Sequence, residues 1–333
     1  MLNGEQISYL YIYPLRKINN RVKIPENNFW GCVKDGIHFG VFTTWDVKSI
    51  IYSLANDKYD LKAVFIHHLK NVDIGELCAL LRGVTTPIYF YLHDYMTICP
   101  RGGLITSEDK YCGSSFPSKN KCRECMFYGK ENAARIEEIK TLFHQISLNL
   151  QFIAPSIAAS REWAKSYPEY ANQIIVINHQ QPKGAFIDNL NEISDKVPLR
   201  IGFVGYQKSL KGWDYWIEGV KKAVEKKCNI EFFQFGSTND HYPFIEEVCV
   251  DFKRSLTSMT DALREKNIHI AVLWSIWPET YSYTYYEELH DTFDGMSMWA
   301  ITSTMSVAYL LTIPFVKMYT DTQLGSILCI LFL

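Results

Sequence analysis

Short apolar runs of four to six residues alternate along this chain with segments whose apolar residues recur at helical spacing. This alternation is typical of a parallel β-sheet wrapped by helices, because a buried parallel strand is apolar on both faces and its crossover is usually helical. The sequence therefore predicts the α/β fold class. With 333 residues, of which 47% are hydrophobic, the chain is long enough for two such domains.

This alternation of strands and helices occurs twice along the chain. The first half predicts strands at 63–66, 88–92, 151–154 and 173–177, and helices at 74–81, 133–146 and 156–166. The second half predicts strands at 200–204, 231–234, 268–273 and 300–302, and helices at 213–226, 259–265 and 281–289. We expect an N-terminal domain at 1–182, a Pro-, Gly- and Asn-containing linker at 183–198 and a C-terminal domain at 199–333. Two Rossmann-like domains would then face each other across a ligand-binding cleft.

Charge and targeting signals argue against nucleic-acid binding, secretion and a membrane-spanning segment. The formal net charge of −2 gives no excess of positive charge that would attract nucleic acid, so we expect no nucleic-acid partner. The N-terminus lacks a basic start followed by a long apolar run, which argues against a secretory signal. The apolar run 300–316 is interrupted by Ser, Thr and Pro, so no membrane span is predicted. We expect a cytoplasmic protein, and association with the inner face of a membrane stays open.

The segment GYQKSLKGW, residues 205–213, follows a predicted strand and opens a predicted helix. A glycine there lets the backbone approach a ligand, and a helix N-terminus with a lysine ammonium suits a pyrophosphate. Gly205, Lys208 and Lys211 are therefore candidate donor-binding residues. Many α/β proteins carry a similar turn without this function, so a purely structural role is an equal alternative.

The segment WPETYSYTYYEEL, residues 277–289, contains Glu279 and Glu287 with seven residues between them. On a helix the two carboxylates would lie roughly 12 Å apart along the axis, at about 1.5 Å per residue. That separation matches the span from a sugar to a ribose across a pyrophosphate, and carboxylates accept hydrogen bonds from hydroxyls. The alternative is that Glu279 complements a helix dipole and Glu287 lies on a solvated face.

Gly205, Lys211 and Gly212, together with Glu279 and Glu287, resemble glycosyltransferase family 4. The stretch YFYLHDYMTICPRGGL at 89–104, with YCG at 111–113 and CREC at 122–125, resembles a bacterial subgroup of that family that acts on surface polysaccharides. The likeness extends over residues 60–303.

The resemblance implies the two-domain GT-B fold and transfer of a hexose-type sugar from a UDP- or GDP-linked donor to a glycan or lipid-linked acceptor. It implies retention of anomeric configuration and no metal ion in the transfer. It assigns Glu279 to the sugar, Glu287 to the ribose, Lys211 to the diphosphate and His93 to the transferred sugar. A histidine satisfied by Asp94 or by the loop backbone is the alternative for His93.

The sequence predicts a long loop at 93–130 between a strand and a helix. Four of the nine cysteines lie in it: Cys99, Cys112, Cys122 and Cys125. Thiolates at such spacing can bind a structural zinc ion or an iron–sulfur cluster, which would hold the loop in one conformation. Only Cys122 and Cys125 have the close spacing of a zinc knuckle, so free or transiently oxidised thiols are the alternative.

Some residues depart from the family pattern. Tyr206 stands where the family commonly has an arginine, and Val307 where it has a glycine. Both ends also appear abbreviated beside the family. These departures keep two other interpretations open: a catalytically reduced protein that binds nucleotide-sugars or glycans, and a partner subunit of a polysaccharide assembly complex.

Overall fold

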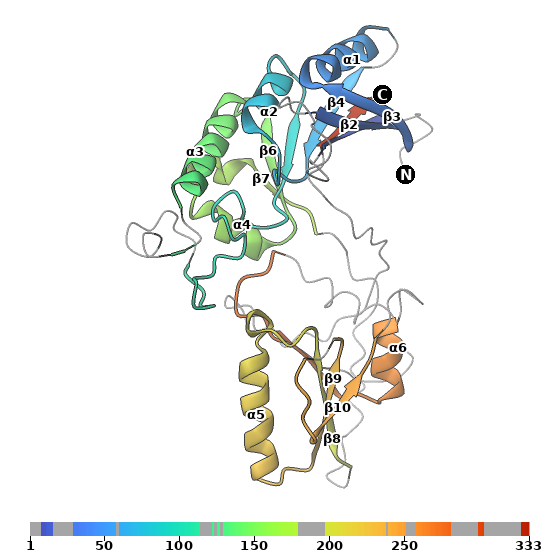
Figure 1. Cartoon of the computed structure of the whole chain (residues 1–333), viewed down its shortest axis with the longest axis vertical. Coiled ribbons are helices and arrows are strands. Elements are labelled where there is room, and N and C mark those ends of the chain that lie inside the picture. Colours follow the sequence, from blue (N-terminus) through green and yellow to red (C-terminus); the bar gives the residue numbers. More distant parts are fainter. Residues whose placement is uncertain are drawn as a thin grey trace, which may run out of the picture. The chain divides into compact units, whose positions relative to one another are not determined.

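A computed structural model describes residues 8–15, 29–57, 60–113, 122, 125–126, 129–178, 197–237, 239–250, 258–280, 299–302 and 328–332 (Figure 1). The chain forms two compact units. Unit 1 comprises Met1–Gly102, Ser114–Ile177 and Thr320–Leu333, and unit 2 comprises Gly103–Gly113 and Asn178–Tyr319.

Unit 1 is built on a sheet in the order β3-β2-β1-β13-β4-β5-β6-β7. Its strands are β1 (Ser8–Pro14), β2 (Phe29–Lys34), β3 (Ile37–Thr43), β4 (Leu61–Ile66), β5 (Ile88–Tyr91), β6 (Leu150–Ala154), β7 (Ile174–Val176) and β13 (Leu328–Phe332). Strands β4 to β7 are parallel neighbours. Strand β13 lies antiparallel between β1 and β4, so it joins the β1–β3 meander to the parallel half.

Local sequence chemistry explains the β2–β3 hairpin. Asp35 and Gly36 form its two-residue turn with φ values of 50° and 81°. Two positive φ angles match the right-handed twist of the strands, and Asp-Gly is a favoured pair for such a turn. The Asp35 carboxylate also accepts hydrogen bonds from the Ser8 hydroxyl and the Tyr9 amide, which fix the turn to β1.

The helices of unit 1 are α1 (Thr44–Asp57), α2 (Ile74–Leu81), α3 (Lys130–Gln145) and α4 (Ile157–Ala164), followed by the 3₁₀ turn η1 (Pro168–Gln173). Asp73 and Ser156 cap α2 and α4 by accepting backbone N–H groups of the first turn. Phe143 of α3 is fully buried and lies at the centre of an aromatic core with Phe90, Phe152, Trp163, Tyr167 and Tyr170.

Unit 2 has a parallel sheet in the order β10-β9-β8-β11-β12. Its strands are β8 (Leu199–Val204), β9 (Ile230–Phe235), β10 (Ile245–Val248), β11 (Ile270–Leu273) and β12 (Trp299–Thr302). The chain runs outward from β8 in one direction to β10, then returns to the other side of β8 with β11. This is the Rossmann strand order, and its direction reverses between β8 and β11.

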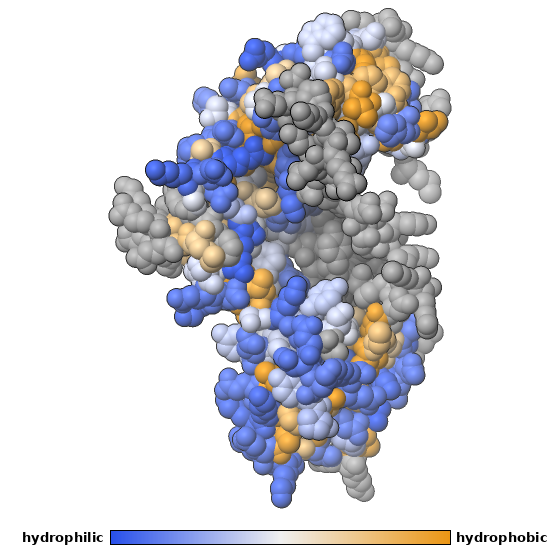
Figure 2. All heavy atoms as spheres, in the orientation of Figure 1, coloured by the Kyte–Doolittle hydropathy of each residue, from blue (hydrophilic) through white to orange (hydrophobic). Residues whose placement is uncertain are grey.

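Helices cover both faces of the unit 2 sheet (Figure 1). Helix α5 (Trp213–Glu225) buries Trp213, Trp216 and Val220 against Phe203 and Phe232. On the other face, α6 (Ser258–Glu265) packs Met259 and Leu263 against Phe233 and Phe235. The outward face of α5 is polar, and hydrophilic residues dominate this part of the surface (Figure 2).

The predicted α/β class is confirmed, and most predicted elements are present. The structure adds β1 to β3, α1, β10 and β13, which the sequence analysis did not predict. The predicted helix 281–289 and most of the predicted linker 183–198 lie outside the described residues, so the proposed domain boundary stays a prediction. Among the described helices, none is long and apolar enough to cross a membrane.

We predict that Phe143→Ala destabilises unit 1 by about 3–5 kcal/mol, because it removes the ring at the centre of the aromatic core. Leu148→Ala is the matched control, since Leu148 is 98% exposed and its truncation should change stability by less than about 0.5 kcal/mol. Urea unfolding followed by tryptophan fluorescence would measure both. Equal effects of the two substitutions would contradict the assigned core.

Candidate functional site

The first candidate site lies at the carboxyl ends of β8 and β11 in unit 2. In an open parallel sheet, ligands bind outside the strand ends where the strand order reverses, and β8 and β11 flank that point. Two segments occupy it: the loop 205–212 after β8 and the segment 274–280 after β11. The sequence analysis singled out the first segment and, in the second, residues 277–280, and the structure brings the two segments together.

Gly212 joins these two segments. It has φ 76° and caps the N-terminus of α5, and a Cβ at this position would lie 2.5 Å from the carbonyl oxygen of Trp274. Only glycine combines a left-handed backbone with so close an approach of another backbone. The Ile276 amide donates to the Leu210 carbonyl at 3.2 Å and adds a second tie between the segments.

Lys211 and Glu279 form an ion pair across the same junction. The Lys211 Nζ lies 2.5 Å from Glu279 Oε1, and the Glu279 side chain is only 9% exposed, against 39% for Lys211. The Ser275 hydroxyl, also buried, donates to the same carboxylate oxygen at 3.1 Å. A cation and an acceptor therefore stand side by side near the N-terminus of α5, which is a favourable place for an anion.

Gly205 begins the loop with φ 132°, and its amide donates to the Phe235 carbonyl at 3.0 Å. Its carbonyl accepts a hydrogen bond of 2.9 Å from Gln234 Nε2. Gln234 is fully buried on β9 and was missed by the sequence analysis. A polar residue inside the apolar strand IEFFQF was the signal that could have identified it, because a buried amide needs partners.

Gln207 was also missed, and it ties the loop after β8 to the loop after β9. Its Oε1 accepts the amides of Asn239 at 2.6 Å and Asp240 at 2.7 Å, and its Nε2 donates to the Asp240 carbonyl at 2.9 Å. The side chain is 9% exposed. A single glutamine thus fixes the relative positions of two loops at the strand ends.

The remaining predicted donor-binding residues differ in placement. Lys208 is exposed, and its Nζ lies 5.6 Å from the centre of the Tyr206 ring. This is the geometry of a surface cation–π contact. Glu287 and Val307 lie outside the described residues, so their expected roles stay predictions.

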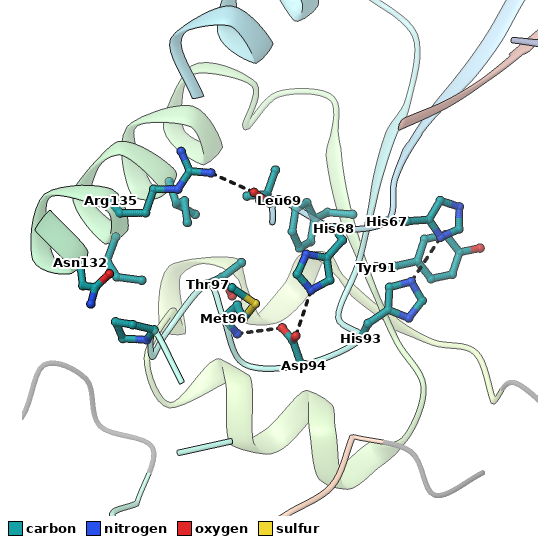
Figure 3. Close-up of a pocket in the computed structure, with 14 residues that line it drawn as sticks. His67, His68, Leu69, Tyr91, His93, Asp94, Met96, Thr97, Asn132 and Arg135 are labelled. Atoms are coloured by element: carbon teal, nitrogen blue, oxygen red, sulfur yellow. Dashed lines mark hydrogen bonds and ion pairs between the residues drawn. The ribbon is translucent and has the colours of Figure 1, made fainter. Parts of the chain in front are cut away.

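The second candidate site belongs to unit 1 and contains His93. A cavity of about 90 Å³ lies where β4 and β5 end, beside α3 (Figure 3). It is lined by His67, His68, Leu69, Phe90, Tyr91, His93, Asp94, Met96, Thr97, Pro100, Asn132, Arg135, Ile136 and Ile139. Its wall places imidazoles, a carboxylate, a guanidinium and an amide among apolar side chains.

The structure places His93 beside His67, and the alternative in which Asp94 or the loop backbone satisfies His93 stays a prediction. The His67 Nδ1 and His93 Nε2 atoms are 3.2 Å apart, and both rings stack with Tyr91. Asp94 accepts from His68 Nε2 at 3.0 Å and from the Met96 amide at 2.8 Å. The sequence analysis noted no role for His67 or His68, although paired histidines after an apolar strand are a signal for polar groups at a sheet edge.

The predicted metal-ligand cysteines divide between the units. Cys99, Cys122 and Cys125 belong to unit 1 and Cys112 to unit 2, and none of these four forms a disulfide. Burial raises the pKa of Cys99, and negative charge on Cys122 or Cys125 would raise it further. The Cys112 thiol donates to the Leu104 carbonyl. Within the described residues, no group of three or more His, Cys, Asp or Glu side chains is placed to hold a metal ion.

No protein-family model and no curated protein matches the chain. Among solved structures, a glycosyltransferase from Rickettsia africae ESF-5 is similar with a TM-score of 0.44 and 14% identity over 78% of this chain and 60% of that one. A GtfA/B complex is similar with a TM-score of 0.41 and 11% identity, over 89% of this chain and 55% of that one. An α,α-trehalose-phosphate synthase (UDP-forming) from Burkholderia xenovorans, in complex with glucose-6-phosphate, is similar with a TM-score of 0.42 and 11% identity. The match covers 78% of this chain and 62% of that one. This chain spans less than two thirds of each of these structures.

We predict that Gly212→Ala destabilises unit 2 by more than about 1–2 kcal/mol, the usual cost of a left-handed non-glycine residue, because its Cβ also collides with the Trp274 carbonyl. Gly219→Ala is the matched control on α5, where a Cβ meets nothing within 4 Å. It should stabilise the helix by about 0.5–1 kcal/mol. Thermal unfolding of both variants measures the difference, and a neutral Gly212→Ala would refute the assigned junction.

The cysteine prediction is tested by metal analysis of protein purified without chelator. A structural site predicts close to one equivalent of zinc, or an iron–sulfur absorption band, that is lost in Cys122→Ser. Cys228→Ser is the control, because Cys228 is exposed on unit 2. Metal-free protein in which all four thiols react with a thiol reagent would favour the alternative of free cysteines.

Proposed function

We propose that the chain is a glycosyltransferase of the GT-B type whose unit 2 binds a nucleotide-sugar. The observation that carries the proposal is the Lys211–Glu279 pair at the point where the Rossmann strand order reverses. It is supported by the sequence pattern, in which Gly205, Lys211 and Gly212 and then Glu279 and Glu287 appear in the order and spacing of family 4.

Lys211 and the N-terminus of α5 are assigned to the donor diphosphate. A helix N-terminus presents unpaired amides and a partial positive charge, and the adjacent ammonium adds a full charge. In this structure Lys211 is neutralised by Glu279. A bound diphosphate would compete for the ammonium, which frees carboxylate lone pairs to accept sugar hydroxyls.

The finer assignments follow the resemblance. Glu287 holds the ribose, Gly205 and Lys208 contribute to the donor loop, and His93 contacts the transferred sugar. The donor is UDP- or GDP-linked, the sugar is of hexose type, and the acceptor is a glycan or lipid-linked molecule. The proposed setting is surface-polysaccharide synthesis in the cytoplasm or at the inner face of a membrane, and a structural zinc ion or iron–sulfur cluster belongs to the proposal for the cysteines.

The proposed chemistry is stabilisation of a departing nucleoside diphosphate. As the glycosidic bond breaks, negative charge develops on the leaving oxygen, and Lys211 with the α5 N-terminus is positioned to offset it. No residue is assigned as a nucleophile. Holding donor and acceptor in one geometry supplies the remaining acceleration.

A second candidate is a protein that binds nucleotide-sugars without turnover. Tyr206 favours it, because an exposed aromatic ring stands where the family has a phosphate-binding arginine. Nucleotide binding without transfer to any acceptor would support this candidate.

We predict that UDP or GDP binds the wild-type chain and that Lys211→Met weakens binding by roughly 1–3 kcal/mol, the usual cost of losing a charged hydrogen bond. Glu279→Gln should weaken the sugar conjugate more than the free nucleotide, since it is assigned to sugar hydroxyls. Isothermal titration calorimetry measures both.

Lys222→Met is the control for these titrations. Lys222 forms an ion pair of the same 2.5 Å length with Glu218 on the exposed face of α5, away from the strand ends. Its loss should leave nucleotide affinity unchanged. A folded wild-type protein that binds no nucleotide or nucleotide-sugar would remove the donor-site assignment.

A further inference from the structure

The Gln234 side chain lies inside unit 2 with only one end of its amide bonded. Its Nε2 donates to the Gly205 carbonyl at 2.9 Å, while its Oε1 is buried and receives no hydrogen bond from the residues that the structure describes. The amide cannot be reversed, because Oε1 would then face the Gly205 oxygen and both atoms are acceptors. Gln234 is fully buried, so this half-bonded amide is enclosed in the core.

A half-bonded amide does not favour stability. A buried polar atom without a partner destabilises the folded state, and an apolar side chain of similar size would avoid that cost. The neighbours of Gln234 on β9 are apolar, since Phe232, Phe233 and Phe235 are all buried. Packing alone would therefore favour an apolar residue at position 234, and what the glutamine supplies is its hydrogen bond to Gly205.

The Gly205 carbonyl is turned towards β9 by two features of that strand. One is the hydrogen bond from Gln234. The other is Gly236, at which a Cβ would lie 3.1 Å from the Gly205 oxygen and crowd it. Gly236 also has φ 122°, a conformation that strains residues with a side chain. The end of β9 thus accommodates this carbonyl oxygen closely.

The direction of the Gly205 carbonyl determines the direction of the next amide. In a trans peptide, the C=O and the following N–H lie in one plane and point in opposite directions. The Tyr206 N–H is therefore directed away from β9. On the other side of β8 lies β11, and the segment 274–280 with Glu279 follows β11.

The Tyr206 N–H is available as a donor. No group in the described part of the chain accepts it, whereas the Gly205 amide donates to the Phe235 carbonyl and the Lys208 amide to the Tyr206 carbonyl. Tyr206 is 57% exposed, so this amide belongs to a surface residue. A backbone N–H on the same loop as the Lys211 ammonium suits an anionic oxygen, because both groups can only donate.

We propose that Gln234 is a positioning residue: it turns the Gly205–Tyr206 peptide so that the Tyr206 N–H binds an oxygen of a phosphate or diphosphate group. The ligand class rests on the proposed function, in which the donor diphosphate lies at this loop. Gln234 acts through the peptide and does not itself contact the ligand.

The test is calorimetry of the full chain with inorganic pyrophosphate, UDP and GDP, in wild type and Gln234→Met. Methionine has a similar volume but no donor, so the Gly205 carbonyl loses its partner and the peptide is free to turn. We expect the affinity for pyrophosphate to fall about tenfold, which corresponds to about 1.4 kcal/mol. The unfolding temperature should stay the same or rise, because the unpaired Oε1 is removed.

Phe232→Leu is the matched control. Phe232 lies two residues before Gln234 on β9, so the two side chains share a face of the sheet, and its ring packs against Trp216. Its substitution should lower the unfolding temperature and leave pyrophosphate affinity unchanged. This is the opposite of the result expected for Gln234→Met, so general damage to the core is distinguished from a turned peptide.

The Tyr206 amide can also be observed directly by NMR of the chain labelled with ¹⁵N-tyrosine, with its signal assigned by loss in Tyr206→Phe. Pyrophosphate should shift this signal in the wild type and slow the exchange of its proton with water. The shift should be smaller in Gln234→Met. If Gln234→Met does not fold, the wild-type spectrum still decides, because bound pyrophosphate that leaves the Tyr206 signal unchanged would overturn the proposal.

The three ligands separate this inference from the proposed function. Nucleotide binding that Gln234→Met leaves unchanged would reject the role of Gln234 and retain the donor site. Pyrophosphate binding that Gln234→Met weakens, in a protein that binds neither UDP, GDP nor their sugar conjugates, would support the role of Gln234 and reject the proposed function. A folded protein that binds none of them would reject both.

Discussion

The close approach of Gly212 to the backbone of Trp274 is the contact on which the unit 2 site depends. It lets the loop after β8 meet the segment after β11 without an intervening side chain. Because the two segments touch, Lys211 can reach Glu279, and the Ser275 hydroxyl donates a hydrogen bond to the same carboxylate. The position of the site follows from strand order, but its charge pairing follows from this one glycine.

In unit 2 the sequence predicted most of the strands and helices and the two loops that carry polar residues. Apolar strands buried on both faces give a strong signal, and a glycine and a lysine between a strand and a helix mark a loop at the strand end. The sequence did not predict that Lys211 and Glu279 bind each other, since that contact joins segments 68 residues apart. Gln207 and Gln234 were missed because their partners are backbone groups of other loops, which no local pattern specifies.

Unit 1 was less predictable for a physical reason. Strand β13 comes from residues 328–332, far along the chain from its neighbours β1 and β4, so its place in the sheet depends on long-range pairing. The Asp35-Gly36 turn was a local signal that was overlooked. His93 was predicted from a motif, but its contact with His67 was not, because that contact depends on the register of β4 beside β5.

The three hydrogen bonds of Gln207 have a consequence for the thermodynamics of recognition. They order the backbone of Asn239 and Asp240 before any ligand arrives. A loop that is already ordered loses little conformational entropy when a ligand binds against it, so more of the contact enthalpy remains as affinity. A molecule that contacts the backbone of Asn239 or Asp240 would therefore meet groups that Gln207 already holds in place.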